Sequence, residues 1–260
     1  MKIAFWSNVH GQAGITSNAI AISILSAIEK HTVALLQSHF TLNNLSLPLL
    51  GLDIIPESFR DSGIDALIRD IKSKPLSKDT VVTDAISVPG LNRRYNLYVG
   101  TGKLNEKDYE REMINMQEPI YNSLAEFHDY VFVDVRSGYR DLSKQILDTS
   151  DLVVVCLDQN THVIDRYFEN PIEADNICYI IGNYDKDSKY NLRNLIKKYP
   201  QLKKKAAVIA HNSEFMDSQN DGTTVQFMLK NYNCKAESSN YEFMQSIYSC
   251  MKLLGIKERG

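Results

Sequence analysis

The chain has 260 residues, 43% hydrophobic and 23% charged, a composition typical of a globular protein and unlike that of a disordered or fibrous one. With 29 basic and 32 acidic residues the formal net charge is −3, so no global positive field attracts nucleic acid or an anionic membrane. The four cysteines form no metal-ligand or disulfide pattern, which favours a reducing cytosol. Without an export signal or an apolar run of roughly 18 residues, we expect a soluble cytoplasmic protein.

The first forty residues predict a strand, a glycine-containing turn, a helix and a second strand, at residues 2–6, 7–14, 16–28 and 32–36. Such a βαβ unit has parallel strands and a right-handed crossover. The pattern of residues 37–84 is weaker and interrupted by prolines, and it predicts one helix over 64–71.

Nearly continuous apolar runs follow, typical of strands buried on both faces of a parallel sheet. The predicted strands are 95–99, 130–135, 152–157, 177–182 and 206–210, with helices over 108–127 and through most of 223–254. We find no linker or repeat, so we expect a single domain over residues 1–260. Its fold class is α/β, a doubly wound, mostly parallel sheet with helices on both faces.

The turn between the first strand and the first helix is the usual phosphate cradle of this fold class. Gly11 and Gly14 let the backbone approach an anion, and Thr16 and Ser17 place hydroxyl groups where a metal-phosphate complex would lie. In the P-loop pattern G-x-x-x-x-G-K-[ST], however, Ile15 stands in place of the lysine. The alternative is that the glycines only turn the chain and Thr16 caps a helix.

Further along the chain, Asp134 ends an apolar strand and Gly138 follows it by four residues. An acidic residue there can hold Mg²⁺, and the glycine can sense a terminal phosphate. Asn183 follows at the end of a later strand, and a turn at 209–212 follows the last one.

In this order, the features resemble the MinD/ParA class of P-loop ATPases over nearly the whole chain. The resemblance implies ATP or ADP with Mg²⁺ as the cofactor, Thr16 and Asp134 as metal ligands, and a homodimer. It implies nucleotide binding by His10, Gly11, Gln12, Ala13, Gly14, Ile15, Thr16, Ser17, Asn183, His211 and Asn212.

The departures from the class concern charge. His10 and Ile15 replace its two lysines, and Gln37 and His39 replace its Asp-x-Asp pair. Losing one phosphate lysine weakens binding about 10- to 150-fold, which binding can survive. A cation that stabilises phosphoryl transfer is worth about 10³ to 10⁵ in rate, so we expect no useful hydrolysis and assign no catalytic residue.

A loop that keeps Gly-x-x-Gly-x-Thr-Ser without the lysines resembles the atypical CpaE/TadZ-like branch, which serves tight-adherence (Flp) pilus assembly. That resemblance implies a pseudo-ATPase scaffold or polar localisation factor that docks on the pilus and secretion machinery. Two alternatives stay open at this point: an active MinD/ParA-type ATPase in partitioning or positioning, and a nucleotide-free α/β protein-interaction module.

Three charged or amphipathic features have alternative interpretations. Arg136 or Arg140 could supply the missing lysine charge, or both could pair with Asp141 or Asp148. The last helix could attach peripherally to the inner face of the cell membrane, but we expect its apolar stripe to pack on the sheet. A basic cluster suits a solvated face better than nucleic acid. The stripe is Met244, Ile247, Tyr248, Met251 and Leu254, and the cluster is Lys197, Lys198, Lys203, Lys204 and Lys205.

Overall fold

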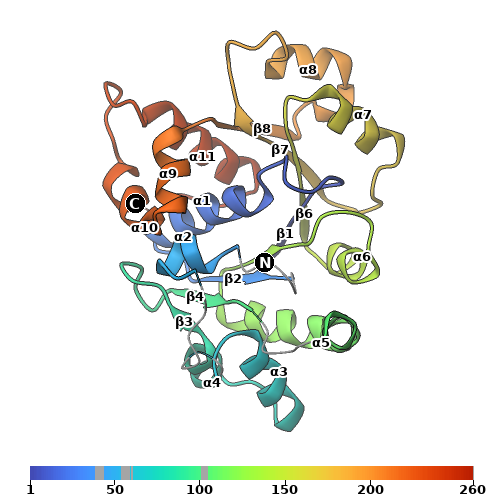
Figure 1. Cartoon of the computed structure of the whole chain (residues 1–260), viewed down its shortest axis with the longest axis vertical. Coiled ribbons are helices and arrows are strands. Elements are labelled where there is room, and N and C mark those ends of the chain that lie inside the picture. Colours follow the sequence, from blue (N-terminus) through green and yellow to red (C-terminus); the bar gives the residue numbers. More distant parts are fainter. Residues whose placement is uncertain (39–43, 54–58, 60, 101–104, 260) are drawn as a thin grey trace.

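The fold is described from a computed structural model over residues 1–38, 44–53, 59, 61–100 and 105–259. Its eight-stranded sheet has the order β3-β4-β2-β5-β1-β6-β7-β8 (Figure 1). Every neighbouring pair is parallel except β3 with β4. The strands are β1 Lys2–Trp6, β2 Val33–Gln37, β3 Ile86–Ser87, β4 Tyr95–Tyr98, β5 Tyr130–Asp134, β6 Leu152–Leu157, β7 Ile177–Tyr184 and β8 Ala206–Ala210.

Helices cover both faces of the sheet. One layer holds α1, α2, α9, α10 and α11, and the other holds α3 to α8 (Figure 1). The helices are α1 Ile15–Ile28, α2 Ser46–Leu50, α3 Ile64–Ser73, α4 Lys78–Asp84, α5 Glu106–Phe127, α6 Asp141–Asp148, α7 Thr161–Glu169, α8 Leu192–Lys198, α9 Ser213–Asn220, α10 Thr224–Asn231 and α11 Tyr241–Leu253.

Successive residues of each central strand serve opposite cores. In β1, Ile3 and Phe5 pack under α1, whereas Ala4 and Trp6 pack on the side of α5 to α7. Because both faces are covered, the strands read as continuous apolar runs in the sequence. The predicted doubly wound, mostly parallel α/β fold is confirmed.

The apolar stripe of α11 lies inside the protein. Met244, Ile247, Met251 and Leu254 are each at most 2% exposed, and the half-buried Tyr248 donates its hydroxyl proton to Glu29 Oε1 at 3.0 Å. The stripe therefore packs on the sheet, as expected. Within the part of the chain that the structure describes, no helix is long and apolar enough to cross a bilayer.

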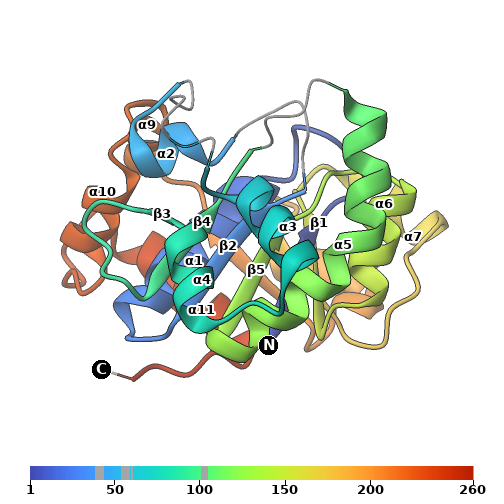
Figure 2. The same ribbon diagram turned by 90° about the horizontal axis from the view of Figure 1, so that it is seen from below.

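Helices α2 and α9 lie side by side near the start of α1 (Figure 2). Their ends meet backbone to backbone, since a Cβ on Gly222 would lie 2.5 Å from Gly51 Cα. Ser17 of α1 also donates a hydrogen bond to Gln219 Oε1 of α9 at 2.8 Å. These contacts connect α9 to α2 and to the first turn of α1.

The substitution Gly222→Ala is expected to lower the free energy of unfolding by about 2–5 kcal/mol, measured by denaturant titration. The φ of Gly222 is 67°, in the left-handed region, which costs an L-residue about 1–2 kcal/mol. Overpacking of the new Cβ against Gly51 adds about 1–3 kcal/mol. Gly255→Ala is the matched control, because its φ is 73° but a Cβ there meets nothing within 4 Å. Equal losses in the two variants would contradict close packing of α2 against α9.

Candidate functional site

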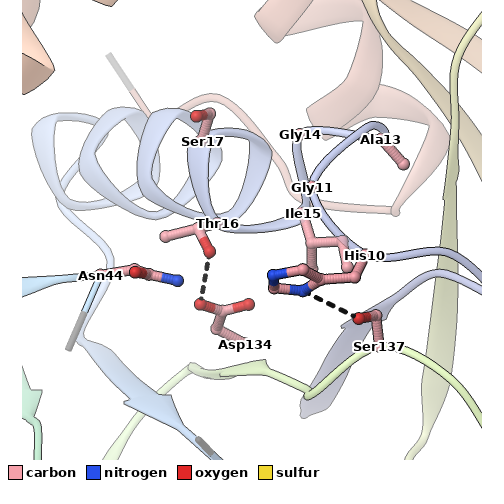
Figure 3. A pocket seen from close by; sticks show the side chains of 10 residues that line it. All are labelled: His10, Gly11, Ala13, Gly14, Ile15, Thr16, Ser17, Asn44, Asp134 and Ser137. Carbon is pink, nitrogen blue, oxygen red and sulfur yellow. Dashed lines mark hydrogen bonds between the residues drawn. The ribbon is translucent and has the colours of Figure 1, made fainter. Parts of the chain in front are cut away.

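A pocket of about 190 Å³ lies at the carboxyl edge of the sheet, where the β1–α1 loop faces the end of β5 (Figure 3). Ligands of open α/β sheets bind at this edge. The pocket is lined by residues from the loop, the start of α1 and the segments after β2 and β5: His10, Gly11, Ala13, Gly14, Ile15, Thr16, Ser17, Asn44, Asp134 and Ser137.

The loop is shaped by its glycines and by one buried amide. Gly11 and Gly14 have φ of 76° and 61°, and Gly14 directly precedes α1. The buried Asn18 donates from Nδ2 to the Ala13 carbonyl at 3.3 Å. A Cβ on Gly182 of β7 would lie 3.1 Å from that same carbonyl, so the loop rests directly on β7.

Thr16 and Asp134 form the polar centre of the pocket. The Thr16 hydroxyl donates to Asp134 Oδ2 at 2.8 Å, and Asp134 is fully buried (Figure 3). Hydroxyl and carboxylate oxygens are the ligands that Mg²⁺ prefers, and Mg²⁺ commonly takes one or two protein ligands beside phosphates and water. The two residues therefore fit a magnesium ion, and the structure brings them together.

Positive charge is scarce in this pocket. Of the described lining residues only His10 and Asp134 can ionise, and His10 Nδ1 lies 3.3 Å from Ser137 Oγ. Ile15 is half-buried and lines the pocket at the position of the phosphate lysine (Figure 3). Gln37, at the end of β2, is 2% exposed. His39 lies outside the described residues.

The other predicted loop residues fall into different positions. Gln12 is exposed and does not line the pocket. Ser17 lines it, but its hydroxyl points to Gln219. Sequence reasoning missed Asn44 and Ser137 as lining residues; the weak pattern after β2 gave no signal for Asn44, whereas Ser137 stands in the predicted Asp134 to Gly138 run.

Three further predicted residues meet at a second pocket of about 460 Å³, at the ends of β7 and β8. Asn183 has a left-handed φ of 48°, and its Oδ1 lies 2.5 Å from His211 Nδ1. Asn212 caps α9 by accepting from the Phe215 amide at 2.7 Å. β6 alone separates β1 from β7, so the two strand ends lie about 10 Å apart.

Both arginines that follow β5 are paired with α5. Arg136 contacts Glu106 and lies 3.7 Å from Glu110, and Arg140 lies 3.5 Å from Glu110. The hydrogen bond from Arg136 lowers the pKa of the Glu106 carboxyl. Neither guanidinium lines the pocket at Thr16 and Asp134, so the hypothesis that one replaces a lysine finds no support. Their partners are Glu106 and Glu110, and not Asp141 or Asp148.

For a nucleotide held at Thr16 and Asp134, we therefore expect Arg136→Ala to change the affinity by less than about threefold, as measured by calorimetry. Its ion pairs are partly exposed, so its free energy of unfolding should fall by no more than about 1 kcal/mol. Arg140→Ala is the comparison variant. A tenfold loss of nucleotide affinity in either variant would instead show that the arginine contacts the ligand.

Solved structures with this architecture cover nearly the whole chain. A ParA-family ATPase from Chlorobium tepidum TLS aligns with a TM-score of 0.70 at 12% identity, over 96% of this chain and 97% of that one. MinD from Aquifex aeolicus aligns with a TM-score of 0.67 at 15% identity, over 98% of both chains. The chain has the MinD/ParA fold.

The septum site-determining protein MinD of Pyrococcus horikoshii OT3, solved with Mg-ADP, has the same fold, with a TM-score of 0.64 at 15% identity over 98% of both chains. No protein-family model matches the sequence, and no curated protein matches it. At these identities the MinD/ParA likeness establishes the fold, and function must be argued from the site.

Proposed function

We propose that this chain is a nucleotide-binding pseudo-ATPase scaffold of the MinD/ParA fold. One observation carries the proposal: the Thr16–Asp134 pair is kept in a pocket whose described lining holds no lysine or arginine. Such a site suits binding of Mg·ADP or Mg·ATP better than cleavage of the nucleotide.

The residues divide the work of binding. Thr16 and Asp134 would hold the magnesium ion, which when bound supplies the positive charge that the phosphates need. The backbone from Gly11 to Ser17 offers N–H groups at the start of α1, which favour an anion through their unpaired donors and the helix dipole. The second pocket, with Asn183, His211 and Asn212, is proposed for the base. The Mg-ADP complex of the Pyrococcus horikoshii MinD supports this choice of ligand.

Hydrolysis asks more of the site than binding does. Phosphoryl transfer develops charge that fixed cations stabilise, and each is worth about 10³ to 10⁵ in rate. Ile15 supplies no such charge, and Gln37 offers no carboxylate to orient water. In this proposal the protein binds the nucleotide without hydrolysing it, and the bound nucleotide stabilises one conformation of the scaffold.

The proposed setting is bacterial tight-adherence (Flp) pilus assembly, where the chain would act as a cytoplasmic homodimer and localisation factor. The loop Gly-x-x-Gly-x-Thr-Ser without lysines supports this branch. Contact with the membrane would come through the partner machinery, because the α11 stripe is buried. We do not expect the protein to bind nucleic acid, because the chain that carries the exposed lysines of the basic cluster has a net charge of −3.

The proposal is tested by thermal unfolding with millimolar Mg·ATP or Mg·ADP, with EDTA as the control. Ligand at 100 times its Kd stabilises by about 2.7 kcal/mol, so the Tm should rise by about 5–10 °C in Mg²⁺ and remain unchanged in EDTA. No shift at millimolar ligand would favour the nucleotide-free interaction module. Steady turnover that Asp134→Ala abolishes would instead identify an active ATPase.

A further inference from the structure

The segment after β5 is fastened to the end of β1. The Gly138 amide donates to the Ser7 carbonyl at 2.9 Å, and the Trp6 indole donates from Nε1 to the Gly138 carbonyl at 3.0 Å. Both backbone groups of Gly138 are therefore engaged. Trp6 is fully buried and is the one tryptophan of the sequence.

The exposed Tyr139 adds two further contacts to this segment. Its ring meets Trp6 edge-on, with ring centroids 5.3 Å apart, and its hydroxyl donates to the Asn170 carbonyl after α7. Aromatic pairs of this geometry contribute beyond their buried area. The segment is thus attached on one side to β1 and on the other to the chain that follows α7.

The attached segment turns Gly138 away from the phosphate pocket. Ser137 lines that pocket, whereas Gly138, Tyr139 and Arg140 line a different cavity of about 500 Å³, shared with Trp6. A phosphate at Thr16 and Asp134 therefore meets the Ser137 hydroxyl and not the Gly138 amide.

We propose that the site does not read a terminal phosphate, and that Trp6 is the positioning residue responsible. Mg·ADP and Mg·ATP then bind with equal affinity. The conformation of the scaffold depends on whether the site holds a nucleotide, and not on the number of its phosphates. This inference rests on the proposed nucleotide site.

The hydrogen bonds gained and lost at Gly138 explain why Mg·ADP and Mg·ATP should bind with equal affinity. To reach a third phosphate, the Gly138 amide must give up Ser7, and moving the segment also breaks the Trp6 bond to its carbonyl. The Gly138 carbonyl would still accept from the Arg140 amide at 3.2 Å, but the indole N–H of the fully buried Trp6 would lose its acceptor. A buried donor without a partner is costly, so the gain of one bond to phosphate is offset. Removing the indole N–H should release the segment.

The test measures the affinities for Mg·ADP and for Mg²⁺ with a non-hydrolysable ATP analogue, by calorimetry, in the wild type and Trp6→Phe. The wild-type affinities should agree within about threefold. Phenylalanine keeps a ring but lacks the donor, so the variant should favour the triphosphate by about tenfold. Tyr95→Phe is the matched control, because it loses a buried hydrogen bond to Ser23 at 2.9 Å far from the loop, and its affinity ratio should stay that of the wild type.

A tenfold wild-type preference for the triphosphate would overturn the inference, as would a Trp6→Phe ratio that stays near one. Tyr139→Phe provides a second variant on an exposed side chain, and we expect it to move the ratio in the same direction by a smaller factor. Failure of both ligands to bind would refute the proposed function itself, which distinguishes that outcome from binding with discrimination.

Discussion

The substitution Ile15→Lys is expected to raise the affinity for Mg·ATP by about 10- to 150-fold, measured by calorimetry. Ile15 is half-buried, begins α1 and lines the pocket beside Thr16 (Figure 3). A lysine there would place an ammonium group against the phosphates, and one charged hydrogen bond contributes about 1.5–3 kcal/mol. The double variant with His10→Lys should bind at least as tightly.

Ile15→Met is the matched control, because it gives a long side chain at the same place without a charge. Its affinity should stay within about threefold of the wild type. We expect turnover to remain near background in the lysine variants, since Gln37 still provides no carboxylate. Unchanged affinity in Ile15→Lys would show that phosphates do not bind beside residue 15.

The second large effect is expected for Asp134→Asn, which should lower the affinity for nucleotide in Mg²⁺ by about 10- to 150-fold and remove its thermal stabilisation. Asn is nearly isosteric and keeps an oxygen that accepts from Thr16, so the unliganded protein should keep its free energy of unfolding within about 1 kcal/mol. Calorimetry and thermal unfolding measure the two quantities.

Thr16→Ser is the control for this experiment, because it keeps the hydroxyl that lies against Asp134. Its affinity should remain near the wild-type value. If Asp134→Asn binds nucleotide as tightly as the wild type in Mg²⁺, the carboxylate is not a metal ligand and the proposed site is wrong.

The central strands could be predicted because each is buried on both faces and therefore consists of consecutive apolar residues. Residues 152–157 form β6, and all six side chains are buried. Such a run of apolar residues identifies a strand without knowledge of the strands that pair with it. The loop from Gly11 to Ser17 was found for a similar reason, since glycine spacing and hydroxyls are local signals. The five-residue α2 was not found, because it contains Pro48 and takes its stability from packing near α9.

Contacts between residues far apart in the chain could not be predicted from the sequence. From the sequence, Asp141 and Asp148 are the nearest candidate partners of Arg136, but Arg136 contacts Glu106, thirty residues earlier on α5. The bond between Trp6 and Gly138 joins residues 132 positions apart. Residue type and spacing predicted which chemistry is present, whereas the direction of each side chain follows from packing between elements.

The proposed Thr16–Asp134 site binds Mg·nucleotide without cleaving it. A crystal structure of the wild-type protein grown with Mg²⁺ and ATP tests this most directly. We expect electron density for a magnesium ion at Thr16 and Asp134 and for an intact triphosphate along Gly11 to Ser17. An empty loop at saturating ATP, or density for a cleaved nucleotide, would contradict it.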